Sequence, residues 1–95
     1  MEKIVFLYKQ ASVPNKIIES AKQKTPPDFE LILCDEKMSS KERREIVSEA
    51  DYFMLYTVGF DDVDVAKKAK LMQILSAGYD RLDVHSLKSA GIPLA

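Results

Sequence analysis

A chain of 95 residues suits one domain, and we expect residues 1–95 to form a single one. Fourteen basic and fifteen acidic residues leave a net charge of −1, which argues against nucleic acid or an anionic membrane as a partner. The first apolar run is too short for a signal peptide or a membrane span, so we predict a cytoplasmic protein. Cys34 is the only cysteine, which excludes an intrachain disulfide and favours a buried thiol.

In the first half of the chain, short apolar runs alternate with amphipathic stretches. Residues 4–8 are a short, continuous apolar run with β-branched side chains, which predicts a strand buried on both faces, and residues 29–33 predict a second strand. Between them, Pro14 suits the first turn of a helix, and the Thr-Pro-Pro run at 25–27 ends it. Ser39, followed three residues later by a glutamate, forms a capping box and predicts the start of a second helix.

The same alternation continues in the second half. Residues 52–56 and 71–75 predict the third and fourth strands. Between these strands, Asp61, Asp62 and Asp64 predict the charged first turn of a third helix, because carboxylates are favourable at a helix N-terminus.

The last predicted helix has the clearest boundaries. Asp83 is expected to be its N-cap, with Leu82 and Leu87 placed as a hydrophobic staple. Gly91 lies where helices turn left-handed and end. Residues 92–95 then predict the start of a fifth strand.

Five strands that alternate with four helices indicate an α/β fold, because parallel strands need helix-length connections. We predict a flavodoxin-like three-layer sandwich around a parallel five-stranded sheet in the order 2-1-3-4-5.

Several polar side chains could suggest chemistry but have simpler interpretations. His85 falls in the first turn of the last helix, with no partner indicated for a general base. Asp80 and Asp83 suit a turn and a cap. Basic residues of the second helix alternate with glutamates and predict a solvated face: Lys41, Arg43 and Arg44.

In open α/β sheets, ligands bind beyond the carboxyl ends of the strands, which selects the loops at 9–13, 57–60 and 76–79. No GxGxxG or GxxxxGK[ST] motif follows any strand, so no phosphate cradle is predicted. The small residues at 76–78 remain, where consecutive amide N–H groups could converge on a carboxylate. A glycine in a tight strand-to-helix turn would give the same pattern. The neighbouring candidates, which could line a pocket or simply pack, are Tyr79, Thr57, Val58 and Gly59.

Residues 76–95 resemble the N-terminal substrate-binding domain of the D-isomer-specific 2-hydroxyacid dehydrogenases. The shared features are the small residues and glycine at 76–78, the D-x-x-D turn at 80–83, a helix, and then a Gly-Ile-Pro sequence at 91–93. Many members of that family have a second glycine where Ser76 stands here. Residues 1–70 match only in the alternation of strands and helices.

The resemblance implies part of an NAD(P)-dependent oxidoreductase that interconverts a 2-oxo acid and a D-2-hydroxy acid. The main-chain N–H groups of Ala77 and Gly78 would hold the substrate carboxylate, with Ser76 in the same turn. The family's catalytic residues, and its site for NAD or NADP, would lie on a missing nucleotide-binding domain beyond Ala95. We therefore assign no catalytic, cofactor-binding or metal-binding residue here, and we expect the 95-residue chain alone to be inactive.

Two further expectations concern partners. In that family a C-terminal segment packs on the substrate-binding domain, so its absence would expose apolar surface and favour a homo-oligomer. The alternative from another class is a stand-alone flavodoxin-like module that binds a small ligand or another protein, because a fold alone does not fix a function.

Overall fold

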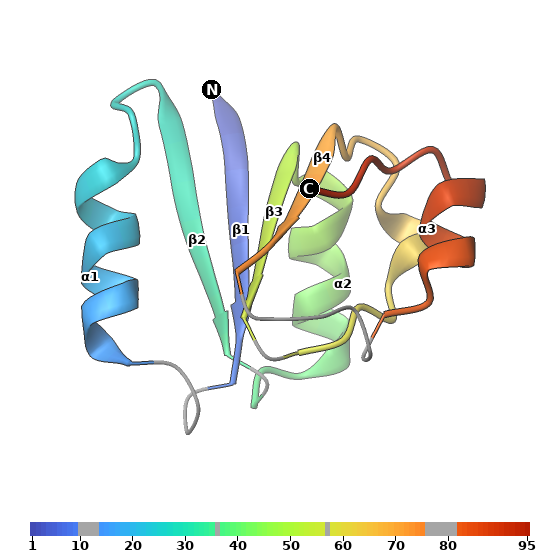
Figure 1. Ribbon diagram of the computed structural model, residues 1–95, viewed down its shortest axis with the longest axis horizontal. Helices are drawn as coiled ribbons and strands as arrows, with labels where there is room; N and C mark the ends of the chain where they lie inside the picture. Colours follow the sequence, from blue (N-terminus) through green and yellow to red (C-terminus); the bar gives the residue numbers. More distant parts are fainter. Residues whose placement is uncertain (10–13, 36, 57, 76–81) are drawn as a thin grey trace.

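The computed structural model describes residues 1–9, 14–35, 37–56, 58–75 and 82–95. The elements within these ranges are, in chain order, β1 (Glu2–Tyr8), α1 (Asn15–Lys24), β2 (Phe29–Asp35), α2 (Ser40–Glu49), β3 (Tyr52–Tyr56), the 3-10 helix η1 (Val63–Val65), β4 (Leu71–Ile74) and α3 (Val84–Ser89). The four strands form one parallel sheet in the order β2-β1-β3-β4 (Figure 1). The predicted α/β class and the order of the first four strands are therefore confirmed.

The predicted fifth strand is wrong within the described residues. Leu94 forms only an isolated parallel bridge with Met72. The Met72 N–H donates to the carbonyl of Pro93 at 2.9 Å, and the Ala95 N–H donates to the Met72 carbonyl at 3.0 Å. Because Pro93 has no N–H to donate, this stretch does not extend into a regular ladder.

The predicted third helix is also wrong: between β3 and β4, the described residues 58–70 contain only the single 3-10 turn η1. Asp62 precedes this turn without making a side-chain capping bond. Its carboxylate is instead buried and hydrogen-bonded to Arg43 and Arg44 of α2. Of the aspartates that predicted a charged helix start, Asp62 and Asp64 instead attach this segment to α2.

Alternation along β1 shows that helices cover both faces of the sheet. Phe6 and Tyr8 pack with Ile18 of α1 in one buried cluster. Val5 and Leu7, which point to the opposite face, pack in a second and larger cluster with residues of α2, η1 and α3. The core therefore lies on both sides of the central strands, as expected for a parallel sheet.

Local sequence signals correctly placed several helix ends. Ser39 accepts a hydrogen bond from the Glu42 N–H at 3.2 Å, and Asp83 accepts one from the Ser86 N–H at 3.1 Å. Gly91 has a φ of +76°, the left-handed conformation predicted there. Among the described helices, none is long and apolar enough to cross a membrane.

Candidate functional site

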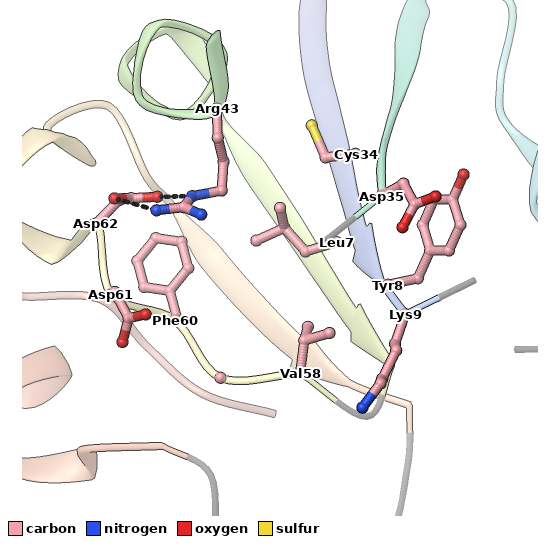
Figure 2. Close-up of a pocket in the computed structure, with 11 residues that line it drawn as sticks. Leu7, Tyr8, Lys9, Cys34, Asp35, Arg43, Val58, Phe60, Asp61 and Asp62 are labelled. Atoms are coloured by element: carbon pink, nitrogen blue, oxygen red, sulfur yellow. Dashed lines mark hydrogen bonds and ion pairs between the residues drawn. The ribbon is translucent and has the colours of Figure 1, made fainter. Parts of the chain in front are cut away.

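A pocket of about 310 Å³ opens at the carboxyl ends of β1, β2 and β3 (Figure 2). This is the edge of the sheet at which a ligand site was predicted. The walls come from the ends of β1 and β2, from α2 and from the segment after β3: Leu7, Tyr8, Lys9, Cys34, Asp35, Arg43 and residues 58–62.

Of the residues predicted from the sequence to bind substrate, Val58 and Gly59 line this pocket. The structure thus brings the end of β3 together with Lys9, which follows β1. The other predicted binding residues lie outside the described residues: Thr57, Ser76, Ala77, Gly78 and Tyr79.

One wall of the pocket is held by a buried ion pair. The Nε of Arg43 lies 2.5 Å from Oδ2 of Asp62, and its Nη2 lies 3.2 Å from Oδ1. The Asp62 side chain is only 2% exposed, whereas that of Arg43 is 26% exposed. The hydrogen bonds that Arg43 donates to Asp62 hold the pKa of Arg43 above its usual value, although partial burial opposes the shift. This fork-to-carboxylate contact fixes the orientation of the guanidinium as well as its charge.

Arg44 extends the same network away from the pocket. Its Nη1 lies 3.3 Å from Oδ1 of Asp62, and its Nη2 lies 2.6 Å from Oδ2 of the exposed Asp64. The prediction of a solvated basic face is therefore wrong for Arg43, which is partly buried against Asp62. Arg44 is more exposed, as predicted, but it also binds two aspartates. The missed partner lies 19 residues from Arg43, a separation at which sequence periodicity carries no signal.

The loop that carries Asp62 is anchored at a second point. Phe60 is 6% exposed and packs edge-on against Phe53, with ring centroids 5.0 Å apart. Between β3 and these anchors, Val58 and Gly59 form the wall of the pocket. The loop is thus held at two points: Phe60 packs into the core, and Asp62 binds α2. Val58 and Gly59 of the same loop line the pocket.

Cys34 and Tyr8 at the pocket have raised pKa values, which keeps both groups in their unreactive, protonated forms. Burial raises the pKa of the Cys34 thiol to about 11, with nearby Arg43 opposing the shift. Burial also raises the pKa of Tyr8, with a further contribution from Asp35. Both side chains are therefore neutral near pH 7. The prediction that Cys34 is buried is confirmed.

The sequence has no glycine-rich dinucleotide-binding motif, and its described residues form no metal centre. The three glycines stand at positions 59, 78 and 91, so no two have the spacing of GxGxxG. Within the described ranges, no three histidine, cysteine or acidic side chains are grouped so that they could hold a metal ion. His85 is exposed on α3, as predicted.

Comparison of the sequence with protein-family models and with curated proteins gives no match. Comparison of the structure does give matches. The 3-phosphoglycerate dehydrogenase of Entamoeba histolytica, solved with NAD+, aligns with a TM-score of 0.80 and 18% identity over 98% of this chain and 32% of that one.

Two other solved dehydrogenases match in the same way. The NAD-dependent formate dehydrogenase of Staphylococcus aureus aligns with a TM-score of 0.67 and 17% identity, over 97% of this chain and 30% of that chain. The D-lactate dehydrogenase of Escherichia coli aligns with a TM-score of 0.64 and 15% identity, over 96% and 30%.

The matched class of proteins is the D-2-hydroxyacid dehydrogenases, and nearly the whole of this chain has the fold of one part of them. This chain spans about a third of the length of the first protein it matches. The resemblance stated from residues 76–95 is therefore confirmed at the level of the fold.

Proposed function

We propose that this chain is the substrate-binding domain of an NAD(P)-dependent dehydrogenase that interconverts a 2-oxo acid and a D-2-hydroxy acid. The supporting observation is that the chain aligns over 98% of its length with about a third of a solved dehydrogenase. The pocket at the carboxyl ends of β1, β2 and β3 adds a site of suitable size for a small acid.

In this proposal the chain positions the substrate and does not carry out hydride transfer. The amides of Ala77 and Gly78 hold the substrate carboxylate, with Ser76 and Tyr79 beside them. Thr57, Val58 and Gly59 line the adjoining wall. NAD or NADP is bound by a separate nucleotide-binding domain, and no residue of this chain is assigned to the cofactor. Holding the substrate in one orientation is itself a large part of catalysis.

An NMR titration of the 95-residue chain with pyruvate tests this proposal. We expect saturable shifts of the amide signals of Val58, Gly59, Ala77 and Gly78, at millimolar concentrations because the second domain does not close the site. Substitution Gly78→Val should abolish the shifts, since its side chain blocks the close approach of a carboxylate to the backbone.

Substitution Ala90→Val at the exposed end of α3 is the control and should leave the titration unchanged. A folded Gly78→Val protein that binds pyruvate as well as the parent would exclude this turn as the carboxylate site. A parent chain that does not respond to pyruvate would favour the alternative of a stand-alone interaction module.

We also propose that the chain associates with a second copy through apolar surface beside α1. A groove of about 390 Å³ lies there, between α1 and the face of the sheet that packs against it. Leu75 at its edge is 37% exposed. The apolar side chains in its lining are Ile4, Phe6, Ile17, Ala21, Met54, Tyr56 and Leu75.

Substitution Leu75→Lys should weaken this association at least about tenfold, because a charged side chain would have to be desolvated at the contact. Sedimentation velocity over a range of protein concentrations measures the effect. Substitution Val84→Lys is the matched control, since Val84 is similarly exposed, at 43%, but lies on α3. A parent protein that stays monomeric at millimolar concentration would contradict the proposal.

A further inference from the structure

Arg43 is a positively charged side chain of the pocket whose orientation is fixed by two hydrogen bonds. Asp62 binds its Nε and its Nη2, which leaves Nη1 as the third nitrogen of the guanidinium. In Figure 2, Nη1 lies on the side of the group away from Asp62, toward Leu7. No described residue accepts a hydrogen bond from it. Because Arg43 lines the pocket, these N–H groups can meet a ligand there.

The pocket contains other charges, and their placement decides which kind of ligand Arg43 can accept. Asp62 forms ion pairs with both Arg43 and Arg44. Asp35 accepts a hydrogen bond from the Lys37 N–H at 3.3 Å. In Figure 2 the exposed Asp61 carboxylate points away from Val58, whereas Lys9 extends beside Val58. The positive groups nearest the Val58 wall are thus Arg43 and Lys9. Because the lining as a whole holds three aspartates against these two cations, the position that suits an acidic oxygen is the one between Arg43 and Lys9.

We propose that Arg43 is a ligand-binding residue of this pocket, held in place by Asp62, and that it binds a second acidic group of the substrate. This inference rests on the proposed function, in which backbone amides hold the first carboxylate. The substrate class is then a small acid with two acidic groups. An arginine fixed before the ligand arrives loses little side-chain freedom on binding, which makes it an efficient donor.

The test compares oxalate with oxamate, in which one of the two carboxylates is replaced by an uncharged amide. Both are titrated into the 95-residue chain, and the amide signals of Val58 and Gly59 are followed by NMR. We expect the parent chain to bind oxalate about tenfold more tightly than oxamate. Substitution Arg43→Gln should remove this preference, because glutamine offers no charge to the second group.

Arg44 provides the matched control. It lies next to Arg43 on α2 and binds the same aspartate, but it does not line the pocket. Substitution Arg44→Gln should therefore leave the preference for oxalate within about twofold of that of the parent. If Arg43 served only the stability of the fold, both substitutions would weaken folding, and neither would change the ratio of the two affinities.

The Arg43→Gln protein is expected to fold, because Arg44 still binds Asp62. Arg43→Lys gives a second measurement: lysine keeps the charge but cannot reach Asp62 and a ligand with separate nitrogens, so part of the preference should be lost. A preference that survives in both variants overturns the role of Arg43 and leaves the proposed function standing. Absence of oxalate binding to the parent overturns both.

Discussion

Substitution Phe53→Ala is expected to lower the free energy of unfolding by about 3–5 kcal/mol. Phe53 is 1% exposed and belongs to β3, the strand that lies between β1 and β4. It packs against Phe60, so alanine would leave a cavity and would also free the loop that forms the pocket wall. A domain of this size has a total stability of about 5–15 kcal/mol, so the loss removes a large share of it and should clearly lower the urea concentration at which the protein unfolds. Urea denaturation followed by circular dichroism measures the change.

Phe29 provides the control for this prediction. It is a phenylalanine of the same sheet, but it begins the edge strand β2 and is only partly buried. Substitution Phe29→Ala should cost about 1–2 kcal/mol, in the ordinary range for single substitutions. A loss below 1 kcal/mol for Phe53→Ala would show that the β3 core can collapse around the smaller side chain.

Replacing both Arg43 and Arg44 with alanine is expected to cost about 3–5 kcal/mol, because a buried carboxylate would lose both of its cationic partners. Asp62 is 2% exposed and accepts hydrogen bonds from both arginines, so water cannot easily replace them. The segment between β3 and β4 should detach from α2 first. Loss of hydrogen-exchange protection at Val65 and Ala66, whose N–H groups bond within this segment, would report that detachment.

Substitution Asp62→Asn provides the decisive comparison. In the double-alanine background it should restore part of the stability, because a neutral buried amide costs less than an unpaired buried charge. In the parent background the same substitution should destabilise, since it weakens two charge-assisted contacts. Substitution Lys41→Ala on the exposed face of α2 should have little effect. If Asp62→Asn restores nothing, the arginines stabilise the fold through packing of their side chains and not through the charge of Asp62.

Local signals were sufficient for most of the secondary structure. The strand at 52–56 was predicted with the observed bounds of β3, and the caps at Ser39 and Asp83 form the expected hydrogen bonds. These features depend on side chains within a few residues of one another, so the sequence shows them directly. The helix predicted at residues 61–69 does not form. Asp62 and Asp64, which suggested a helix start, instead bind arginines of α2.

The structure has a pocket at the edge of the sheet where the sequence predicted a ligand site, and two of the predicted residues line it. The rule that ligands bind beyond the carboxyl ends of parallel strands led to Val58 and Gly59, which line the pocket. Arg43 was missed because its neighbours in the sequence are charged residues typical of a solvated helix face. Nothing nearby in the chain indicates that it turns toward a buried aspartate.

The sequence by itself determined the α/β class and several helix ends, because hydrophobic periodicity and capping are local properties. The order of the first four strands was predicted correctly from a common order of parallel α/β sheets, not from a local signal. Only the tertiary structure decided three other features. Residues 92–95 make a bridge instead of a strand, the described residues 58–70 form one 3-10 turn instead of a helix, and Asp62 holds Arg43 at the pocket. Each depends on which residue of a distant element satisfies a hydrogen-bonding group, and that choice exists only once the chain is folded.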